Sequence, residues 1–366
     1  MTGRTEKVVK NQGVQTLDAV WSMAELRMVG DGIFFPDLLR LRSRIQSWED
    51  WWAQFARLGE EYGEKAKEAE AAGHLITAGE HYFQAAICWH FAQFLWFDRP
   101  DEKLHALRRK VELYRQGAPL FVPPAERVDI DFDGSVIPGY LRLPDGNGEK
   151  APVAVLLGGL DSTKEEAYHF ENACLRRGLA TFSFDGPGQG EYFLQRPLAP
   201  DFERYSSAVV DYLVTRPELD SKRIGIVGRS LGGYFAARAA AFDPRLRACV
   251  IFGALYDLAQ LDSIPVRTQM GFRFATGIDD PDEAKAAVQA RVNLEGIPSR
   301  ITQPIYILHG ALDILIPVSQ AQRLYDEVSS VDKTLVIIPD GIHCAHNLYH
   351  LVRRPMVDWL AGKLMA

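Results

Sequence analysis

The sequence is poor in cysteine and lacks the cysteine spacings that hold metals or disulfide frameworks. Its 366 residues include four cysteines, and no two of them form a CxxC pair. They are Cys88, Cys174, Cys249 and Cys344. Scattered cysteines indicate neither a zinc site nor a disulfide-stapled secreted fold. A chain of this length buries enough apolar surface without such staples, so we expect no metal and no other cofactor.

The sequence also lacks an excess of positive charge and any long apolar run. Its formal net charge is -7, and nucleic acids and anionic membranes both attract basic faces, so we expect neither as a partner. No run of about 18 apolar residues is present, so no membrane span is expected. The first residues, MTGRTEKVVKNQGVQT, are polar and contain no apolar core of a secretory signal. A cytoplasmic protein is therefore expected.

Residues 1–122 have the pattern of a helical domain. Apolar residues recur at helical spacing over 48–72 and 77–97, and a further helix is expected at 103–116. Six of the seven tryptophans lie in this region; we interpret them as helix packing, the alternative being an aromatic pocket that faces a second domain. The pair Pro123-Pro124 marks the end of this N-terminal helical cap domain.

Residues 123–366 alternate between strand and helix patterns. A hairpin of strands is expected at 127–133 and 137–143, because apolar and polar residues alternate there. Further strands are expected at 153–157, 180–184, 224–227, 248–252, 305–308 and 334–338, with helices near 164–177, 201–215, 231–242, 318–329 and 348–363. This order predicts an α/β fold with a mostly parallel sheet and helices on both of its faces. The unusually long interval 254–303 is expected to form a lid insertion.

Gly228-Arg-Ser-Leu-Gly232 is a GxSxG motif between an expected strand and an alanine-rich helix. In this setting small residues allow a tight turn that lifts the serine hydroxyl above the sheet edge. The helix that follows directs free N–H groups at negative charge that forms there. We therefore expect Ser230 to be a nucleophile; the alternative is a glycine-rich packing turn.

A serine nucleophile needs a base and an acid, which follow it in this chain order. His343 lies in the loop IIPDGIHCAHN directly after an expected strand, with His346 as its rival. Asp313 lies after the preceding strand in HGALD, where a carboxylate can fix the histidine tautomer. Asp340 is a poorer choice because it is too close in sequence to approach His343 from the far side. His309, at the end of the same strand as Asp313, is expected to support the loop.

Two further loops belong to the expected site. Backbone N–H groups for the oxyanion are expected from Leu231, directly after the nucleophile, and from Leu160 in the loop GGLDSTKEE, with Gly159 as the alternative. The loop FDGPGQGE, 184–191, is rich in glycine but lacks the Lys and Ser/Thr of a phosphate-binding P-loop. We expect Asp185 to tie this loop beside the active site.

Together, the motifs GGLDSTKEE, FDGPGQGE, GRSLGGY, ILHGALD and GIHCAHN resemble the α/β-hydrolase superfamily. More narrowly, the chain resembles the branch that contains dihydroxypseudooxynicotine hydrolase, a C–C bond hydrolase, and fungal polyketide-shortening hydrolases. The resemblance covers most of the chain, including TAGEHYFQAAICWHFAQFLW in the helical region and the strand pair ending in PGYLRLP. It implies an α/β-hydrolase fold with a helical cap over the active site, a homodimer, and a triad of Ser230, Asp313 and His343.

The expected function is hydrolysis through an acyl-enzyme. The favoured reaction is cleavage of a C–C bond next to a carbonyl, in an aromatic or polyketide-like β-diketone or aryl ketone. The enzyme alternative is a carboxylesterase or lactonase with the same triad. The alternative from another class is a ligand-binding member of the fold without catalysis, although such proteins usually lose a triad residue and all three are present here.

Overall fold

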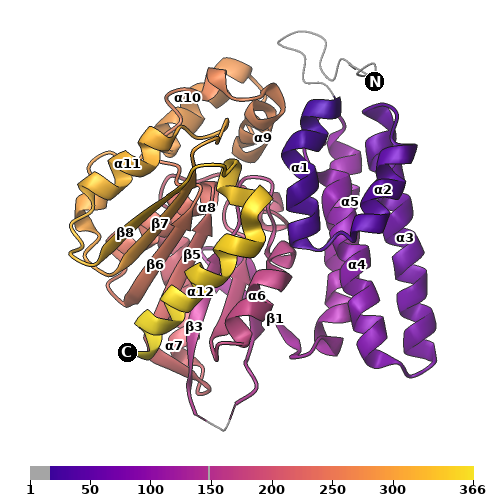
Figure 1. Cartoon of the computed structure of the whole chain (residues 1–366), viewed down its shortest axis with the longest axis horizontal. Helices are drawn as coiled ribbons and strands as arrows, with labels where there is room; N and C mark the ends of the chain where they lie inside the picture. Colours follow the sequence, from indigo (N-terminus) through magenta and orange to yellow (C-terminus); the bar gives the residue numbers. More distant parts are fainter. Residues whose placement is uncertain (1–16, 147–148) are drawn as a thin grey trace. The chain divides into compact units, whose positions relative to one another are not determined.

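The computed structural model describes residues 17–146 and 149–366, which form two compact units (Figure 1). The helical unit comprises the described residues up to Ala125 together with Asp262–Gly271. The sheet unit comprises Glu126–Leu261 and Phe272–Ala366. The division expected from the sequence, a cap at 1–122 and a catalytic domain at 123–366 with a lid insertion at 254–303, stays a prediction.

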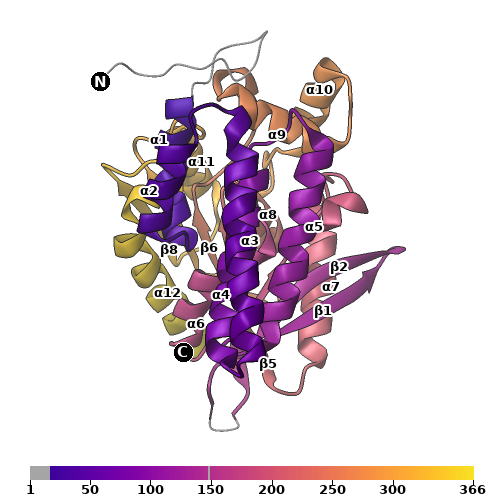
Figure 2. The same cartoon turned by 90° about the vertical axis from the view of Figure 1, so that its right-hand side faces the viewer.

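Five helices make up most of the helical unit. They are α1 (Leu17–Asp31), α2 (Phe35–Arg44), α3 (Glu49–Ala71), α4 (Leu75–Gln93) and α5 (Pro100–Gly117). The three longest, α3, α4 and α5, run side by side (Figure 2). Nearly every residue in the second half of α4 is buried, as its almost uniformly apolar sequence predicts. The three helices expected at 48–72, 77–97 and 103–116 are thus confirmed, with ends shifted by a few residues.

Tryptophans form the core of the helical unit. The Trp51 ring lies 4.8 Å from that of Trp21 and 5.1 Å from that of Trp48, and Trp48 lies 5.1 Å from Trp96. The indole N–H of Trp51 donates to the carbonyl of Phe91 at 2.8 Å. Because these rings pack on one another, they stabilise the helix packing.

Asp262–Gly271 includes the start of α9 (Val266–Thr276) and is anchored in the helical unit by one buried arginine. Arg267 donates from Nη1 to the carbonyl of Leu95 at 2.8 Å and from Nη2 to Asp98 at 2.7 Å. Its guanidinium also lies 3.9 Å from the ring centroid of Trp48. These three partners satisfy much of the hydrogen-bonding and charge of a side chain that is otherwise costly to bury.

The sheet unit is built on eight strands in the order β1-β2-β4-β3-β5-β6-β7-β8 (Figure 1). β2 pairs with β4 antiparallel, and every pair from β4 through β3 to β8 is parallel. The strands are β1 (Ala125–Phe132), β2 (Ser135–Arg142), β3 (Ala151–Leu157), β4 (Ala180–Phe184), β5 (Leu219–Arg229), β6 (Leu246–Phe252), β7 (Ile305–Gly310) and β8 (Lys333–Ile338). The expected hairpin and all six later strands are confirmed, and β5 begins five residues earlier than expected.

Helices cover both faces of this sheet. Alternate strand residues such as Leu156, Val250 and Leu308 pack with Met356 and Leu360 of α12; α6 lies on the same face (Figure 1). The opposite residues face α8, where Ile251 abuts Gly233. The helices of the unit are α6 (Tyr168–Leu175), α7 (Phe202–Thr215), α8 (Leu231–Phe242), α10 (Pro281–Arg291), α11 (Val318–Glu327) and α12 (Tyr349–Met365), besides the second half of α9. The expected mostly parallel, two-face-covered sheet is confirmed.

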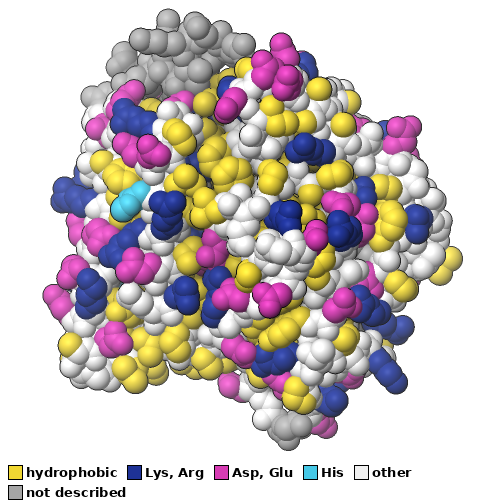
Figure 3. Space-filling view, turned by 180° about the vertical axis from the view of Figure 1, so that it is seen from behind, with side chains coloured by type: hydrophobic (Ala, Val, Ile, Leu, Met, Phe, Trp, Pro, Cys, Tyr) yellow, Lys and Arg dark blue, Asp and Glu magenta, His cyan; other side chains and the backbone are white. Residues whose placement is uncertain are grey.

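Charges of both signs share the molecular surface. On the face drawn in Figure 3, Lys and Arg side chains are interspersed with Asp and Glu side chains. Among the described residues, no helix is both long and apolar enough to cross a membrane. All four cysteines are buried free thiols.

Candidate active site

Ser230 occupies a tight turn between β5 and α8. Its φ of 56° and ψ of -120° place it in a strained region that non-glycine residues rarely adopt. A Cβ on Gly228 would overlap the carbonyl of Gly232, and a Cβ on Gly232 would come within 2.5 Å of the carbonyl of Leu157. Both glycines of the GxSxG motif are therefore required by close backbone approach. The turn holds the serine hydroxyl at the carboxyl end of the parallel strands, as the motif predicts.

The loops after β7 and β8 bring an aspartate and a histidine to the same edge of the sheet. The backbone N–H of Leu312 donates to the carbonyl of Gly341 at 2.9 Å, which joins the two loops. Gly310 and Gly341 lie against each other with no room for a side chain between them: a Cβ on Gly310 would stand 2.6 Å from the carbonyl carbon of Gly341. Because adjacent parallel strands end at one edge, this contact places Asp313 and His343 together.

Ser230, His343 and Asp313 form one continuous hydrogen-bonded chain. His343 Nε2 lies 2.9 Å from Ser230 Oγ, and His343 Nδ1 lies 2.7 Å from Asp313 Oδ2. The Asp313 side chain is fully buried, whereas that of His343 is 17% exposed. With Nδ1–H donating to the carboxylate, Nε2 of neutral His343 is free to accept the serine proton.

The environment shifts the pKa of both charged partners in opposite directions. Burial raises the pKa of the Asp313 carboxyl, but the lowering effect of His343 and of the backbone N–H of Ile316 is larger, so the net shift is downward. Burial lowers the pKa of His343, but the Asp313 carboxylate outweighs it, so the net shift is upward. The pair therefore stabilises positive charge on the imidazole, as a general base requires after it takes a proton.

His309 supports the aspartate loop and is held neutral. Its Nδ1 accepts the backbone N–H of Ala254 at 3.1 Å, so the proton resides on Nε2, which donates to the carbonyl of Ile316 at 2.9 Å. Burial lowers the pKa of His309. The supporting role expected for this residue is confirmed.

The two rival residues do not lie in the hydrogen-bonded chain. His346 is buried, with its ring centroid 6.3 Å from that of His343. Asp340 is exposed, and its carbonyl accepts from the Asn347 side chain at 2.7 Å. Asn347 in turn accepts the backbone N–H of Ile342 at 3.0 Å, so these residues shape the loop that carries His343.

Leu231 and the loop that carries Leu160 both adjoin the nucleophile turn, and the role of these residues as oxyanion donors stays a prediction. Leu231 is the first residue of α8, so its N–H precedes the intrahelical bonds of that helix. The loop that carries Leu160 touches the nucleophile turn: a Cβ on Gly159 would stand 3.2 Å from the Cβ of Ser230. Gln189 restrains the same loop, because its Nε2 donates to the carbonyls of Gly158 and Gly159, both at 2.7 Å.

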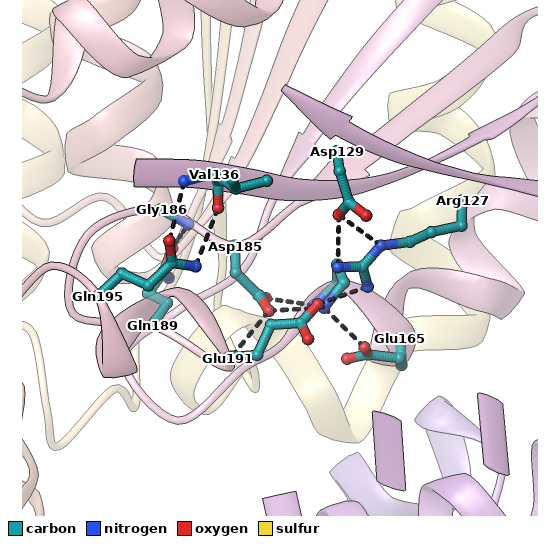
Figure 4. Close-up of polar contacts among 10 residues, drawn as sticks. Arg127, Asp129, Val136, Glu165, Asp185, Gly186, Gln189, Glu191 and Gln195 are labelled. Carbon is teal, nitrogen blue, oxygen red and sulfur yellow. Dashed lines mark hydrogen bonds and ion pairs between the residues drawn. The ribbon is translucent and has the colours of Figure 1, made fainter. Parts of the chain in front are cut away.

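A buried lysine ties the glycine-rich loop after β4 to the loop after β3. Its partners Glu165, Asp185 and Glu191 come from these two loops (Figure 4). Lys164 Nζ lies 2.8 Å from Glu165, 2.8 Å from Asp185 and 2.7 Å from Glu191. Burial lowers the pKa of Lys164, but the three carboxylates raise it well above its ordinary value. The backbone N–H of Lys164 also donates to Asp185 at 2.8 Å, which confirms that Asp185 ties the loop.

The three carboxylates around Lys164 could in principle ligate a metal, because their oxygens lie within 4.8 Å of one another. The lysine ammonium already sits among them as the compensating cation, and Arg127 adds a second positive charge 2.5 Å from Glu191. The cluster is thus a structural ion network.

Sequence reasoning did not find Lys164 or Gln189. Lys164 lies in the charged string STKEE, which is typical of an exposed loop, yet its side chain is completely buried. Gln189 lies in the loop 184–191, which the sequence marks only by its glycines. The one sequence feature that points to either residue is that each lies shortly after an expected strand, near the edge of the sheet where the site forms.

Comparisons with known proteins show that this chain is similar to known hydrolases. The sequence matches the family model described as esterase FrsA-like over residues 43–270, and that of the prolyl oligopeptidase family over residues 205–364. The 2,6-dihydropseudooxynicotine hydrolase of Paenarthrobacter nicotinovorans is 42% identical over 342 residues, which cover 93% of this chain and 91% of that protein.

A crystal structure and a fungal relative extend the comparison. The crystal structure of the 2,6-dihydroxy-pseudo-oxynicotine hydrolase aligns with a TM-score of 0.87 at 40% identity, over 93% of this chain and 95% of that one. The alpha/beta hydrolase ucsC of an Acremonium species is 37% identical over 238 residues, 58% of this chain and 48% of that protein. The chain therefore spans about half the length of this fungal relative. The resemblance expected from the motifs is confirmed.

Proposed function

Because the chain belongs to the FrsA-like esterase family of α/β-hydrolases, we propose that it is a hydrolase whose catalytic triad is Ser230, His343 and Asp313. The observation that carries this proposal is the unbroken chain from Ser230 Oγ to His343 at 2.9 Å and from His343 to Asp313 at 2.7 Å. Nucleophile, base and orienting acid are thus within hydrogen-bonding reach of one another before any substrate binds.

In the first half of the reaction, His343 Nε2 takes the proton of Ser230 as Oγ forms a bond to the substrate carbonyl carbon. The carbonyl oxygen becomes an oxyanion, which the backbone N–H groups of Leu231 and Leu160 stabilise. Asp313 stabilises the imidazolium. Collapse of the tetrahedral intermediate breaks the bond to the leaving group, which receives the proton from His343 and departs, leaving an ester on Ser230.

In the second half, His343 takes a proton from water, and the hydroxide forms a bond to the acyl carbon. The second tetrahedral intermediate breaks the bond to Ser230 Oγ, which recovers a proton from His343. The products are a carboxylic acid and the protonated leaving group, so one water molecule is consumed for each bond cleaved.

The leaving group of the proposed reaction is carbon. Support comes from the relative at 42% identity over 93% of this chain, which is named 2,6-dihydropseudooxynicotine hydrolase. A carbon leaving group requires a stabilised carbanion, so the proposed substrate is a β-diketone or an aryl ketone with an electron-rich ring. His343 then protonates carbon instead of an alkoxide or amine.

A carboxylesterase or lactonase activity with the same triad is the second candidate. It is favoured by the matching family model, which is described as an esterase and covers residues 43–270. The chemistry differs only in the leaving group, which is an oxygen that needs no carbanion stabilisation. We also propose a homodimer, and a cytoplasmic location that suits four buried free thiols.

Paired turnover assays test the proposed function. Purified wild-type protein and Ser230→Ala are incubated with aryl esters, lactones, β-diketones and hydroxylated aryl ketones, and products are identified by mass spectrometry. We expect Ser230-dependent C–C cleavage and labelling of Ser230 by a fluorophosphonate probe. Ester cleavage alone would support the second candidate, and full turnover by Ser230→Ala would refute the triad.

A further inference from the structure

Gln189 joins the glycine-rich loop after β4 to the loop that carries the expected oxyanion donor. Gln189 is only 2% exposed. The carboxamide oxygen accepts the backbone N–H of Gly186 at 3.1 Å, which fixes the orientation of the amide (Figure 4). Both hydrogens of Nε2 are then directed at the loop after β3, where they meet the carbonyls of Gly158 and Gly159.

These two carbonyls belong to the peptide groups that contain the candidate oxyanion donors. The carbonyl of Gly158 shares its peptide plane with the N–H of Gly159, and the carbonyl of Gly159 shares its plane with the N–H of Leu160. In a trans peptide the C=O and N–H bonds point in opposite directions. Holding both carbonyls on Gln189 therefore directs both N–H groups away from it.

Other contacts restrain the same loop. The carbonyl of Gly159 also accepts the backbone N–H of Ser162 at 3.2 Å, which closes a turn around Leu160. The nucleophile turn lies so close to Gly159 that a Cβ added there would stand 3.2 Å from the Cβ of Ser230. Rotation of either peptide plane would cost a hydrogen bond to a buried amide, since Gln189 would be left with an unsatisfied donor.

From this arrangement we infer that Gln189 is a positioning residue for the oxyanion hole: its carboxamide sets the peptide planes of the loop so that N–H groups face the developing oxyanion. The inference rests on the proposed function, because it presumes attack by Ser230. Preorganised donors of this kind stabilise the transition state more than the bound substrate.

The structure offers a control in Gln195, an exposed residue six positions further along the same segment. Its carboxamide also bonds two backbone groups, the N–H of Val136 at 2.9 Å and the carbonyl of Val136 at 3.1 Å (Figure 4). These bonds tie the segment to β2 rather than to the loop beside Ser230. Gln189→Met and Gln195→Met thus remove the same chemistry from two different places.

The test uses full-length protein, a chromogenic aryl ester, and an aryl boronic acid that forms a tetrahedral adduct with the serine. For Gln189→Met we expect kcat to fall on the order of 10- to 100-fold, below the full loss of one donor, with KM nearly unchanged. The inhibition constant of the boronic acid should rise by the same factor. Gln195→Met should match wild type in both, and the acidic limb of the pH–rate profile should not move in either variant.

Gln189→Glu, measured at pH 8, covers the case in which Gln189→Met does not fold. It keeps an acceptor for Gly186 but loses both donors, so it should show the same losses while thermal unfolding reports a folded protein. An unchanged boronic acid affinity in the Gln189 variants, or equal losses in Gln195→Met, would overturn the inference while Ser230→Ala remains inactive. Activity in Ser230→Ala would instead overturn the proposed function, and the inference with it.

Discussion

Replacing Lys164 with methionine tests the buried ion network most directly. The variant keeps the length and apolar stem of the side chain but removes an ammonium within 2.8 Å of Glu165, Asp185 and Glu191. Removing one partner of a buried ion pair costs about 3–5 kcal/mol, because the other charge is left buried. The loss of unfolding free energy should not reach three times this value, because Glu191 keeps a second cationic partner, Arg127, at 2.5 Å. We therefore expect Lys164→Met to lose about 3–5 kcal/mol of unfolding free energy.

The loss should depend on pH in a definite direction. In the wild type, burial raises the pKa of Glu191, but the opposing effect of Lys164 is larger, so the net shift of this pKa is downward. The stabilisation that Glu191 contributes is therefore present above its unfolded pKa and is lost as pH falls through its folded pKa. In Lys164→Met, Glu165 and Asp185 lose the lysine cation, so burial raises their folded pKa values above their unfolded values. The deficit is then largest at neutral pH and shrinks as pH falls through those raised values.

Urea unfolding followed by far-UV circular dichroism measures both effects. Tryptophan fluorescence is recorded separately, because six of the seven tryptophans lie in the helical unit and report on it. Lys363→Met is the control: that lysine pairs with Asp332 at 2.6 Å, but the two side chains are 32% and 43% exposed, so its loss should be within about 1 kcal/mol. A Lys164→Met deficit as small as this control, or one that is equal at pH 8 and pH 5, would refute the reasoning.

Two further predictions concern the triad and its turn, and a third concerns a helix. Asp313→Asn should lower kcat by a factor of about 10²–10⁴. Because the Asp313 carboxylate raises the pKa of His343, the acidic limb of the pH–rate profile of the variant should lie at lower pH than that of the wild type. A limb that stays in place would contradict this. Gly232→Ala places a methyl group within 2.5 Å of the Leu157 carbonyl and should abolish turnover and lower the melting temperature. Gly362→Ala, whose added Cβ meets nothing within 4 Å in a helix, should stabilise by about 0.5–1 kcal/mol, as thermal unfolding would measure.

The residues that the sequence predicts best are those that a local pattern places. Ser230 is fixed by a strand, a tight turn and a helix that are contiguous in the chain, and Asp313 and His343 each follow a recognisable strand. Parallel strands end at one edge of the sheet, so strand order alone brings the three together. The register of β7 and β8 and the close contact of Gly310 with Gly341 then allow the hydrogen bonds from His343 to Asp313 at 2.7 Å and to Ser230 at 2.9 Å.

The residues that escaped prediction act across long sequence separations. The contacts of Lys164 with Glu191 and of Gln189 with Gly158 depend on the position of β4 between β2 and β3 in the sheet. A lysine in a polar string carries no local sign of burial, since nearly all such lysines are solvated. In the same way, Arg267 belongs with Leu95, 172 residues earlier, and no periodicity in the interval 254–303 indicates this.

The anchoring of Asp262–Gly271 limits how this protein can be cut apart or recombined. The chain re-enters the helical unit at Asp262 and leaves it after Gly271, inside α9. A fragment that ends at Ala125 would therefore lack a segment that the unit packs as its own. Leu95 and Asp98 would lose the guanidinium that bonds them both. A chimera that exchanges the helical unit with that of a relative must therefore transplant two separate stretches of sequence, and α9 must be spliced in its middle, between Gly271 and Phe272.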